Sequence, residues 1–241
     1  FTWVTGSQYI YSFDKCFFMP ADFTGGLEYN QDNLTDDMWG YNRYTKQEVR
    51  IASAFFQNEW KNKQWSFLLG GRLDKHNMVD HVSPRANLRY NPTENMNLRA
   101  SYSFGFRAPQ AFDEDLHIEN VGGTVSMIEL AKDLTEEKSQ SLSISGDLYH
   151  RWGDFQGNLL IEGFYTSLSD VFALRQKGER DGIIINERYN EKGAKVYGLT
   201  LEGKIAYRSL LQLQAGVTMQ KAEYKQARAW SDDETVPMEK K

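Results

Sequence analysis

Residues 196–207 read VYGLTLEGKIAY, and this stretch alternates between two kinds of side chain. Odd positions carry tyrosine, leucine, isoleucine or glycine, whereas the polar residues Thr200, Glu202 and Lys204 stand at even positions. A period of two predicts a β-strand with one apolar and one polar face. At roughly 3.3 Å per residue the apolar stripe is about 33 Å long. Tilted by about 45°, it covers roughly 23 Å of depth, close to the apolar band of an outer-membrane barrel, and a tyrosine stands at each interfacial end.

The same alternation recurs along the chain. It is strongest in Asn97–Phe106, Ser139–Tyr149 and Leu211–Lys221, and no convincing amphipathic helix of globular length is present. Together these stretches predict an all-β protein of roughly ten antiparallel up-and-down strands, a partial transmembrane β-barrel. Weaker alternation predicts the remaining strands at Gln8–Phe18, Asp22–Asn30, Gln47–Trp60, Gln64–Asp74, Val82–Tyr90 and Phe155–Leu168.

The connections between the predicted strands alternate between short and long. Large aromatic residues flank the short ones, and one rim of tight turns opposite one rim of long loops is the layout of an outer-membrane barrel. The short connections lie near Met19–Ala21, Lys61–Lys63, Asn91–Asn95, Arg151–Asp154 and Arg208–Leu210. The long ones lie near Gln31–Lys46, Lys75–His81, Arg107–Lys138, Leu174–Lys195 and after Lys225.

A soluble β-sandwich or solenoid that binds glycans is the alternative, with the apolar stripes as its core. The predicted strands are longer than the usual strand of about 5–6 residues, which argues against a sandwich. In a sandwich the stripes would face a second sheet, whereas in a barrel they face outward from a single layer. The opposite faces also carry arginines instead of the lysine and threonine of an ordinary solvent-exposed face: Arg72, Arg85, Arg89, Arg99 and Arg107.

Composition excludes several other classes. A net charge of -5, from 28 basic and 33 acidic residues, gives no electrostatic footprint for nucleic acid. The single cysteine, Cys16, cannot form an internal disulfide framework or a cysteine-based zinc site. No nucleophile–base pattern is present, so we predict no catalytic residues, no enzyme activity and no cofactor.

Two sequence boxes carry a family resemblance. Residues 105–109 read GFRAP at the end of one predicted strand, and residues 133–139 read DLTEEKS at the start of the next. These resemble the "GFRAP" and "NPxLxxExS" boxes of TonB-dependent outer-membrane receptors, although Ala131-Lys132 replaces the Asn-Pro of the second box. The matching positions are Gly105, Phe106, Arg107, Ala108, Pro109, Leu134, Glu137 and Ser139. Further stretches fit the same family, in the style of Bacteroidetes receptors: Gln57–Trp60, Gly70–Asp74, Ser83–Ala86 and Gly163–Tyr165.

The resemblance implies a transport function at the bacterial outer membrane. Such a receptor takes up a bulky nutrient, such as an iron–siderophore, haem or cobalamin, and is energised by the TonB complex through a plug domain. Outer-membrane lipid and a surface lipoprotein are further implied partners. The family barrel has about 22 strands, so residues 1–241 are expected to form part of one barrel domain without the plug and the C-terminal strands. Such a fragment would carry open sheet edges.

The resemblance also implies roles for charged residues. Arginines on the polar face point into the lumen, where water or plug carboxylates can satisfy them. Arg72, Arg85, Arg89 and Arg99 are therefore predicted to face the lumen and the plug, either as plug contacts or as solvated charges.

The loop between the two boxes is the predicted ligand mouth. It carries the acidic residues Asp113, Glu114 and Asp115, which are either ligand contacts or ordinary solvated charges. His117 occupies the interval where haem receptors of this family carry a loop histidine, and a neutral imidazole is a good axial iron ligand. A structural role in a polar loop is the alternative for His117. The sequence alone predicts no other metal site.

Overall fold

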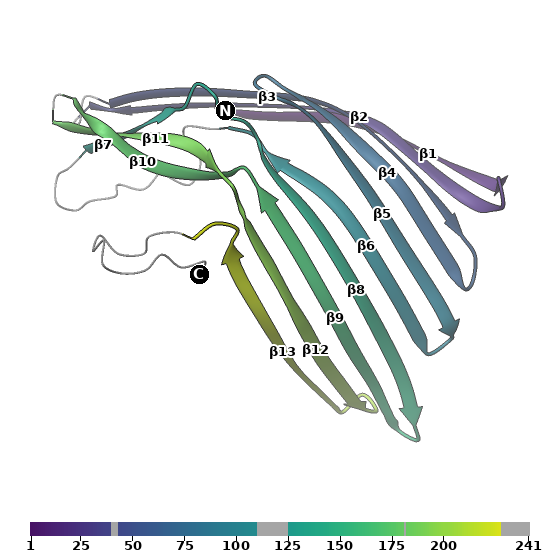
Figure 1. Ribbon diagram of the computed structural model, residues 1–241. Helices are drawn as coiled ribbons and strands as arrows, with labels where there is room; N and C mark the ends of the chain where they lie inside the picture. The colour runs from purple at the N-terminus through teal and green to yellow at the C-terminus, as the bar shows by residue number, and fades with distance from the viewer. Residues whose placement is uncertain (40–42, 110–124, 181, 228–241) are drawn as a thin grey trace.

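A computed structural model describes residues 1–39, 43–109, 125–180 and 182–227. Its main feature is one antiparallel sheet of ten strands, which curves through space as a single layer (Figure 1). No helix of the described residues is long and apolar enough to span a membrane. In spatial order the strands are β1 (Thr2–Cys16), β2 (Met19–Met38), β3 (Arg43–Lys61), β4 (Trp65–His76), β5 (Asp80–Thr93), β6 (Met96–Arg107), β8 (Glu137–Trp152), β9 (Phe155–Ser169), β12 (Ala194–Tyr207) and β13 (Leu211–Tyr224).

The ten strands confirm the predicted all-β, up-and-down fold. Each predicted stretch lies within or overlaps one strand of the sheet, and each strand pairs antiparallel with its neighbours in this spatial order. The register places Leu199, Gly163 and Ile144 side by side on β12, β9 and β8. Because the alternation has period two and the register is unshifted here, apolar positions of neighbouring strands share one face.

The two faces of the sheet differ in chemistry. We call the face that carries Leu199, Leu201 and Ile205 the apolar face, and the opposite face, with Thr200 and Glu202, the polar face. Within the described residues no second sheet covers the apolar face, so the β-sandwich alternative is wrong. The apolar face holds most of the exposed large hydrophobic side chains, among them Tyr9, Leu27, Phe56, Leu73, Leu88, Leu142, Ile144, Ile161, Leu213 and Val217.

Aromatic rings form a belt along the tight-turn ends of the strands. Trp60 stacks between Phe18 and Phe67, with ring centroids 5.8 Å away in each case. Trp65 stacks on Tyr90 at 4.1 Å. The belt continues across the later hairpins through Trp152, Phe155 and Tyr207, whose successive centroids are 6.2 and 4.8 Å apart. Such a girdle suits the boundary between hydrocarbon and water, where an aromatic ring can face both.

A second sheet of three strands corrects the prediction that Arg107–Lys138 and Leu174–Lys195 are long loops. It contains β10 (Val171–Arg180), β11 (Ile183–Glu191) and β7 (Val125–Leu130). β7 and β11 lie within the segments predicted as long loops, and β10 begins three residues before the second of these segments. β10 and β11 form a hairpin, and β7 pairs with β11 in parallel. This sheet lies at the end of the main sheet opposite the tight turns (Figure 1).

Two other predicted long loops are also shorter than expected. Residues 77–79 alone connect β4 with β5, where a loop from Lys75 to His81 was predicted. β2 and β3 continue their pairing as far as Met38 and Arg43, so most of the predicted loop Gln31–Lys46 is strand. The sequence signal fails here because polar residues stand on both faces of these extensions and only Leu34, Met38 and Tyr44 are apolar or aromatic, which removes the alternation that identifies a strand.

Candidate functional site

The polar face carries a network of charges centred on Arg72 of β4. The Arg72 guanidinium donates to Glu28 at 2.9 Å, to Asp74 at 2.7 Å and to the Ser53 hydroxyl at 2.7 Å. Ser53 in turn donates to Asp74 at 2.6 Å, and the side chains of Ser53 and Asp74 are buried. Three strands are thereby joined on one face, because β2, β3 and β4 each contribute a partner.

The other predicted lumen arginines lie on the same face but differ in their partners. Arg99 of β6 forms an ion pair with Asp147 of β8 at 3.2 Å. Arg85 of β5 donates to the amide oxygen of Gln57. Arg89 stands directly opposite Arg99 in the ladder. Among the described residues Arg89 forms no ion pair, and its buried Nε has no hydrogen-bond partner.

A cavity of 1030 Å³ lies beside Arg72 and Arg85 on the polar face. Residues of β1 to β6 line it, and its charged members are Glu28, Arg72, Asp74, Arg85 and Arg107. Three of these five are guanidinium groups, whose planar donors match carboxylate geometry. The cavity can therefore receive anionic groups, either from a ligand or from another segment of protein.

The GFRAP box ends β6 in a packed corner. The Arg107 guanidinium lies over the Phe172 ring, 4.9 Å from its centroid, and 3.9 Å from the Glu137 carboxylate. Glu137 also accepts a hydrogen bond of 3.0 Å from the backbone N–H of Phe172. Ala108 and Pro109 are buried. Arg107 thus links the main sheet to β10.

The second box is attached to the first and to β11. Gly105 pairs with Ser139 in the ladder, and a Cβ at position 105 would lie only 2.9 Å from the Ser139 hydroxyl. The N–H of Leu134 donates to the carbonyl of Ala131 at 3.1 Å. The Asn190 side chain accepts from the N–H of Thr135 at 2.8 Å and donates to its carbonyl at 3.1 Å. Both boxes therefore shape one rim of the sheet.

His81 fills a place where the ladder between β5 and β6 stops. The pairing reaches Arg85 and Ser103 and goes no further toward this rim. Beyond it, the imidazole of His81 stacks on Phe106 at 4.3 Å, and its Nδ1 lies 3.7 Å from the Glu136 carboxylate. Side-chain packing thus replaces backbone hydrogen bonds at this position.

The predicted ligand-mouth residues fall outside the described residues. Asp113, Glu114, Asp115 and His117 all belong to residues 110–124. The described part of the chain holds no group of three His, Cys, Asp or Glu side chains that could bind a metal ion.

The small sheet has a charge network that the sequence did not suggest. Glu187 of β11 pairs with Arg175 of β10 and also with Lys177, at 3.1 Å. Lys177 reaches Glu129 of β7 at 3.4 Å. Hydrogen bonds from Arg175 and Lys177 lower the pKa of Glu187. The run Ile183-Ile184-Ile185 after Gly182 is the one signal that could have predicted β11.

The comparisons with known proteins agree with this architecture. The family model "TonB dependent receptor-like, beta-barrel" matches residues 2–238. A search of curated proteins found no match. The siderophore receptor PirA from Pseudomonas aeruginosa has 16% identity and a TM-score of 0.68, with 96% of this chain and 51% of that chain covered. PirA from Acinetobacter baumannii has 18% identity and a TM-score of 0.70, with 94% of this chain and 37% of that chain covered. The FrpB iron transporter from Neisseria meningitidis has 15% identity and a TM-score of 0.65, with 92% of this chain and 36% of that chain covered.

The chain spans about half or less of the length of these solved structures. At such low identity the structures establish the fold, whereas the family model covers nearly the whole chain. TonB-dependent receptors are outer-membrane proteins of Gram-negative bacteria, and they are transporters rather than enzymes. The chain belongs to the TonB-dependent receptor family and forms part of its β-barrel.

Proposed function

We propose that this chain is barrel wall of a receptor that takes up an iron–siderophore complex across the outer membrane. The observation that carries the proposal is the division of the sheet into an apolar face and a polar face with guanidinium groups beside a cavity. Hydrocarbon suits the first face, and a hydrated passage for a charged complex suits the second. The structural relatives include siderophore receptors and an iron transporter, which favours iron over cobalamin.

The proposed orientation places the five tight turns in the periplasm and the three-stranded sheet outside the cell. The aromatic belt at the tight turns then lies at the inner boundary of the membrane. In whole cells, labelling at Gly122 is expected and labelling at Asn95 is not. Labelling at Asn95 without labelling at Gly122 would show that the receptor has the opposite orientation.

The proposed energy source is TonB, acting through a plug domain outside these residues. Arg85 and Arg89 are the preferred plug contacts of the four predicted arginines, because Arg72 and Arg99 already pair with carboxylates of the barrel wall. Plug carboxylates would neutralise these charges in the lumen. A contact with a surface lipoprotein and the Bacteroidetes style of the motifs both stay predictions.

The proposed ligand mouth is the segment that contains Asp113, Glu114, Asp115 and His117. It connects two described anchors, the buried Pro109 and β7, which pairs with β11. If the cargo is haem instead of a siderophore, His117 is the residue expected to ligate its iron. Replacing His117 by Ala should then abolish haem binding, whereas in a receptor whose cargo is a siderophore the same change should leave cargo binding intact.

Binding and uptake by the full-length receptor test the proposal. Ferric siderophores, haem, cobalamin and other metal chelates are compared as ligands, first with purified receptor and then in cells. We expect binding of a ferric siderophore and uptake that stops when TonB is deleted. Uptake that persists without TonB would contradict the proposed mechanism. Selective binding of haem or cobalamin would contradict the proposal that the cargo is a ferric siderophore.

A further inference from the structure

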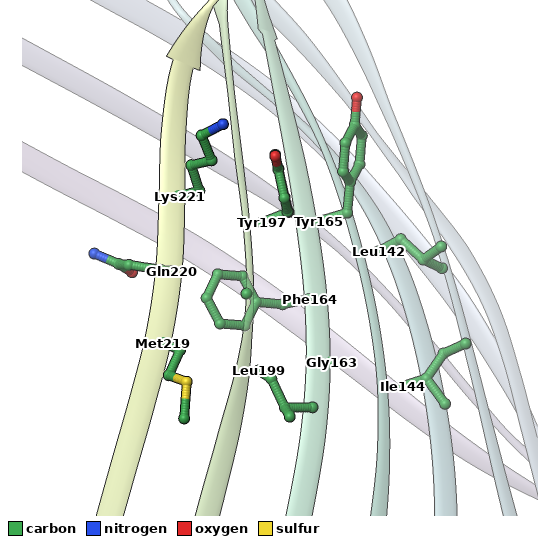
Figure 2. A pocket seen from close by; sticks show the side chains of 11 residues that line it. Leu142, Ile144, Gly163, Phe164, Tyr165, Tyr197, Leu199, Met219, Gln220 and Lys221 are labelled. Carbon is green, nitrogen blue, oxygen red and sulfur yellow. The ribbon is translucent and has the colours of Figure 1, made fainter. Parts of the chain in front are cut away.

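The apolar face of β8, β9, β12 and β13 contains a groove at the level of Gly163 (Figure 2). In the ladder Gly163 lies between Ile144 and Leu199, and a Cβ built at position 163 would meet no atom within 4 Å. The glycine therefore leaves a slot between the side chains of Ile144 and Leu199. The groove has a volume of 640 Å³, and its walls include Leu142, Ile144, Tyr165, Tyr197, Leu199 and Met219.

The groove has an apolar end and a polar end. Figure 2 shows the hydroxyls of Tyr165 and Tyr197 and the ammonium group of Lys221 directed toward the same end, away from Leu199 and Met219. This end faces the rim with the three-stranded sheet, because β13 runs from a tight turn toward that rim (Figure 1). An apolar slot that leads to hydroxyl and ammonium groups matches an amphiphile with one chain and a polar head.

The polar end carries an excess of positive charge. Lys195 Nζ lies 2.9 Å from the Glu223 carboxylate, and Lys221 pairs with the same carboxylate. The Lys195 ammonium also lies 5.7 Å from the centroid of the Tyr197 ring. Lys225 extends the cluster and bonds to the neutral hydroxyl of Ser169 at 3.1 Å. Lys195 and Lys221 thus share one carboxylate, and Lys225 adds a third ammonium group, which bonds to a neutral hydroxyl, so the preferred ligand of this cluster is an anion.

We propose that this groove binds a phosphate-bearing lipid of the outer leaflet. One acyl chain lies in the slot at Gly163, and the phosphate accepts hydrogen bonds from Lys221, Lys195 and the two tyrosine hydroxyls. The inference rests on the proposed function, which places the apolar face in lipid and this end of the groove at the outer headgroups. Charge-assisted bonds to phosphate and an apolar slot together select an anionic lipid over a neutral one.

The acyl slot is tested on the full-length receptor in mild detergent, with diphosphoryl lipid A as the probe and native mass spectrometry to count bound lipid. Gly163→Leu fills the slot and should weaken binding about tenfold. Gly203→Leu is the matched control, because Gly203 lies on the same face of β12, outside the groove, and a Cβ there also meets no atom within 4 Å. Equal lipid binding by the two variants would overturn the proposal.

The phosphate site is tested by a second comparison. Wild-type receptor should prefer diphosphoryl lipid A to its dephosphorylated form, and the double variant Lys195→Gln and Lys221→Gln should lose this preference. Lys204→Gln, on the polar face, should keep it. A preference retained by the double variant, or a receptor dimer that Gly163→Leu dissociates, would overturn the assignment to a lipid.

Siderophore uptake and folding of the same receptors separate this inference from the proposed function. A receptor that inserts and takes up its siderophore but shows no lipid selectivity contradicts only the lipid site. A wild-type receptor that does not insert in the outer membrane contradicts the proposed function itself.

Discussion

Adjacent residues of one strand meet opposite environments in this sheet. The Leu201 side chain lies on the apolar face, and the residue is 41% exposed. The Thr200 hydroxyl lies 3.0 Å from that of Thr218 on the polar face. Leu201→Arg should lower the free energy of unfolding by roughly 2–4 kcal/mol, because its charge meets hydrocarbon near mid-depth, and Thr200→Arg should cost much less. Denaturant unfolding of the full-length receptor in lipid vesicles measures both, and equal losses would contradict the assignment of the faces.

Asp74 is the polar-face residue whose loss should matter most. Its buried carboxylate accepts hydrogen bonds from Arg72 and Ser53. Asp74→Leu removes the acceptor, so the Ser53 hydroxyl and one Arg72 N–H lose their hydrogen-bond partner. This should lower the free energy of unfolding by about 1–3 kcal/mol. Asp37→Leu, at an exposed position near the end of β2, should change it far less. The same unfolding measurement checks both variants, and a stable Asp74→Leu protein would show that the network adds little.

The shared face of the arginines could be predicted at the residue scale, but their partners could not. Period-two alternation alone places Arg72, Arg85, Arg89 and Arg99 on the polar side. The contact between Arg72 and Glu28 joins residues 44 positions apart and depends on the register across β2, β3 and β4. No local pattern specifies that register. For Asp113 to His117, which the structure does not describe, the predictions remain open.

At the scale of elements, alternation predicted strands wherever one face is apolar and the other polar. It failed for β7, β10 and β11, which stand at the rim and carry charges such as Arg175 and Glu187 on strands without an apolar stripe. It also predicted β2 and β3 too short, because polar residues stand on both faces of their outer ends. Strand pairing there depends on partners brought close by the main sheet.

The charge network of the small sheet predicts a dependence on pH. Glu187 has a pKa below its ordinary value of 4.5 because Arg175 and Lys177 donate hydrogen bonds to it. A carboxyl group with a lowered pKa contributes stability above its unfolded pKa, and this contribution is lost as pH falls through the folded pKa. The protection factors of the β11 amides, which correct the exchange rates for the intrinsic effect of pH, should therefore decrease below about pH 4.5.

Substitutions test that assignment to Glu187. Glu187→Gln should remove this acid-dependent change in β11, because no carboxyl group remains to titrate there. Glu179→Gln, on the exposed end of β10, should leave the change intact. Identical pH profiles for the Glu187→Gln and wild-type proteins would contradict the role of this carboxylate.

At the scale of the whole molecule, the two faces of a single-layer sheet meet different environments, hydrocarbon on one side and water on the other. Large apolar side chains are exposed on one face, while the charges on the other pair or line a cavity. In the described part of the chain β1 and β13 each have one neighbour, so each leaves a row of backbone groups for another strand. Such a sheet is stable where hydrocarbon covers its apolar face and further strands continue the barrel.

The environment of position 201 tests this account most directly. A spin label attached there in the full-length receptor, reconstituted in lipid bilayers, should be accessible to oxygen and shielded from polar relaxants, because Leu201 faces lipid. A label at position 200 should show the reverse, since that side chain points into the lumen. A label at position 201 that is shielded from both oxygen and polar relaxants would place the apolar face inside a protein core and contradict the membrane barrel.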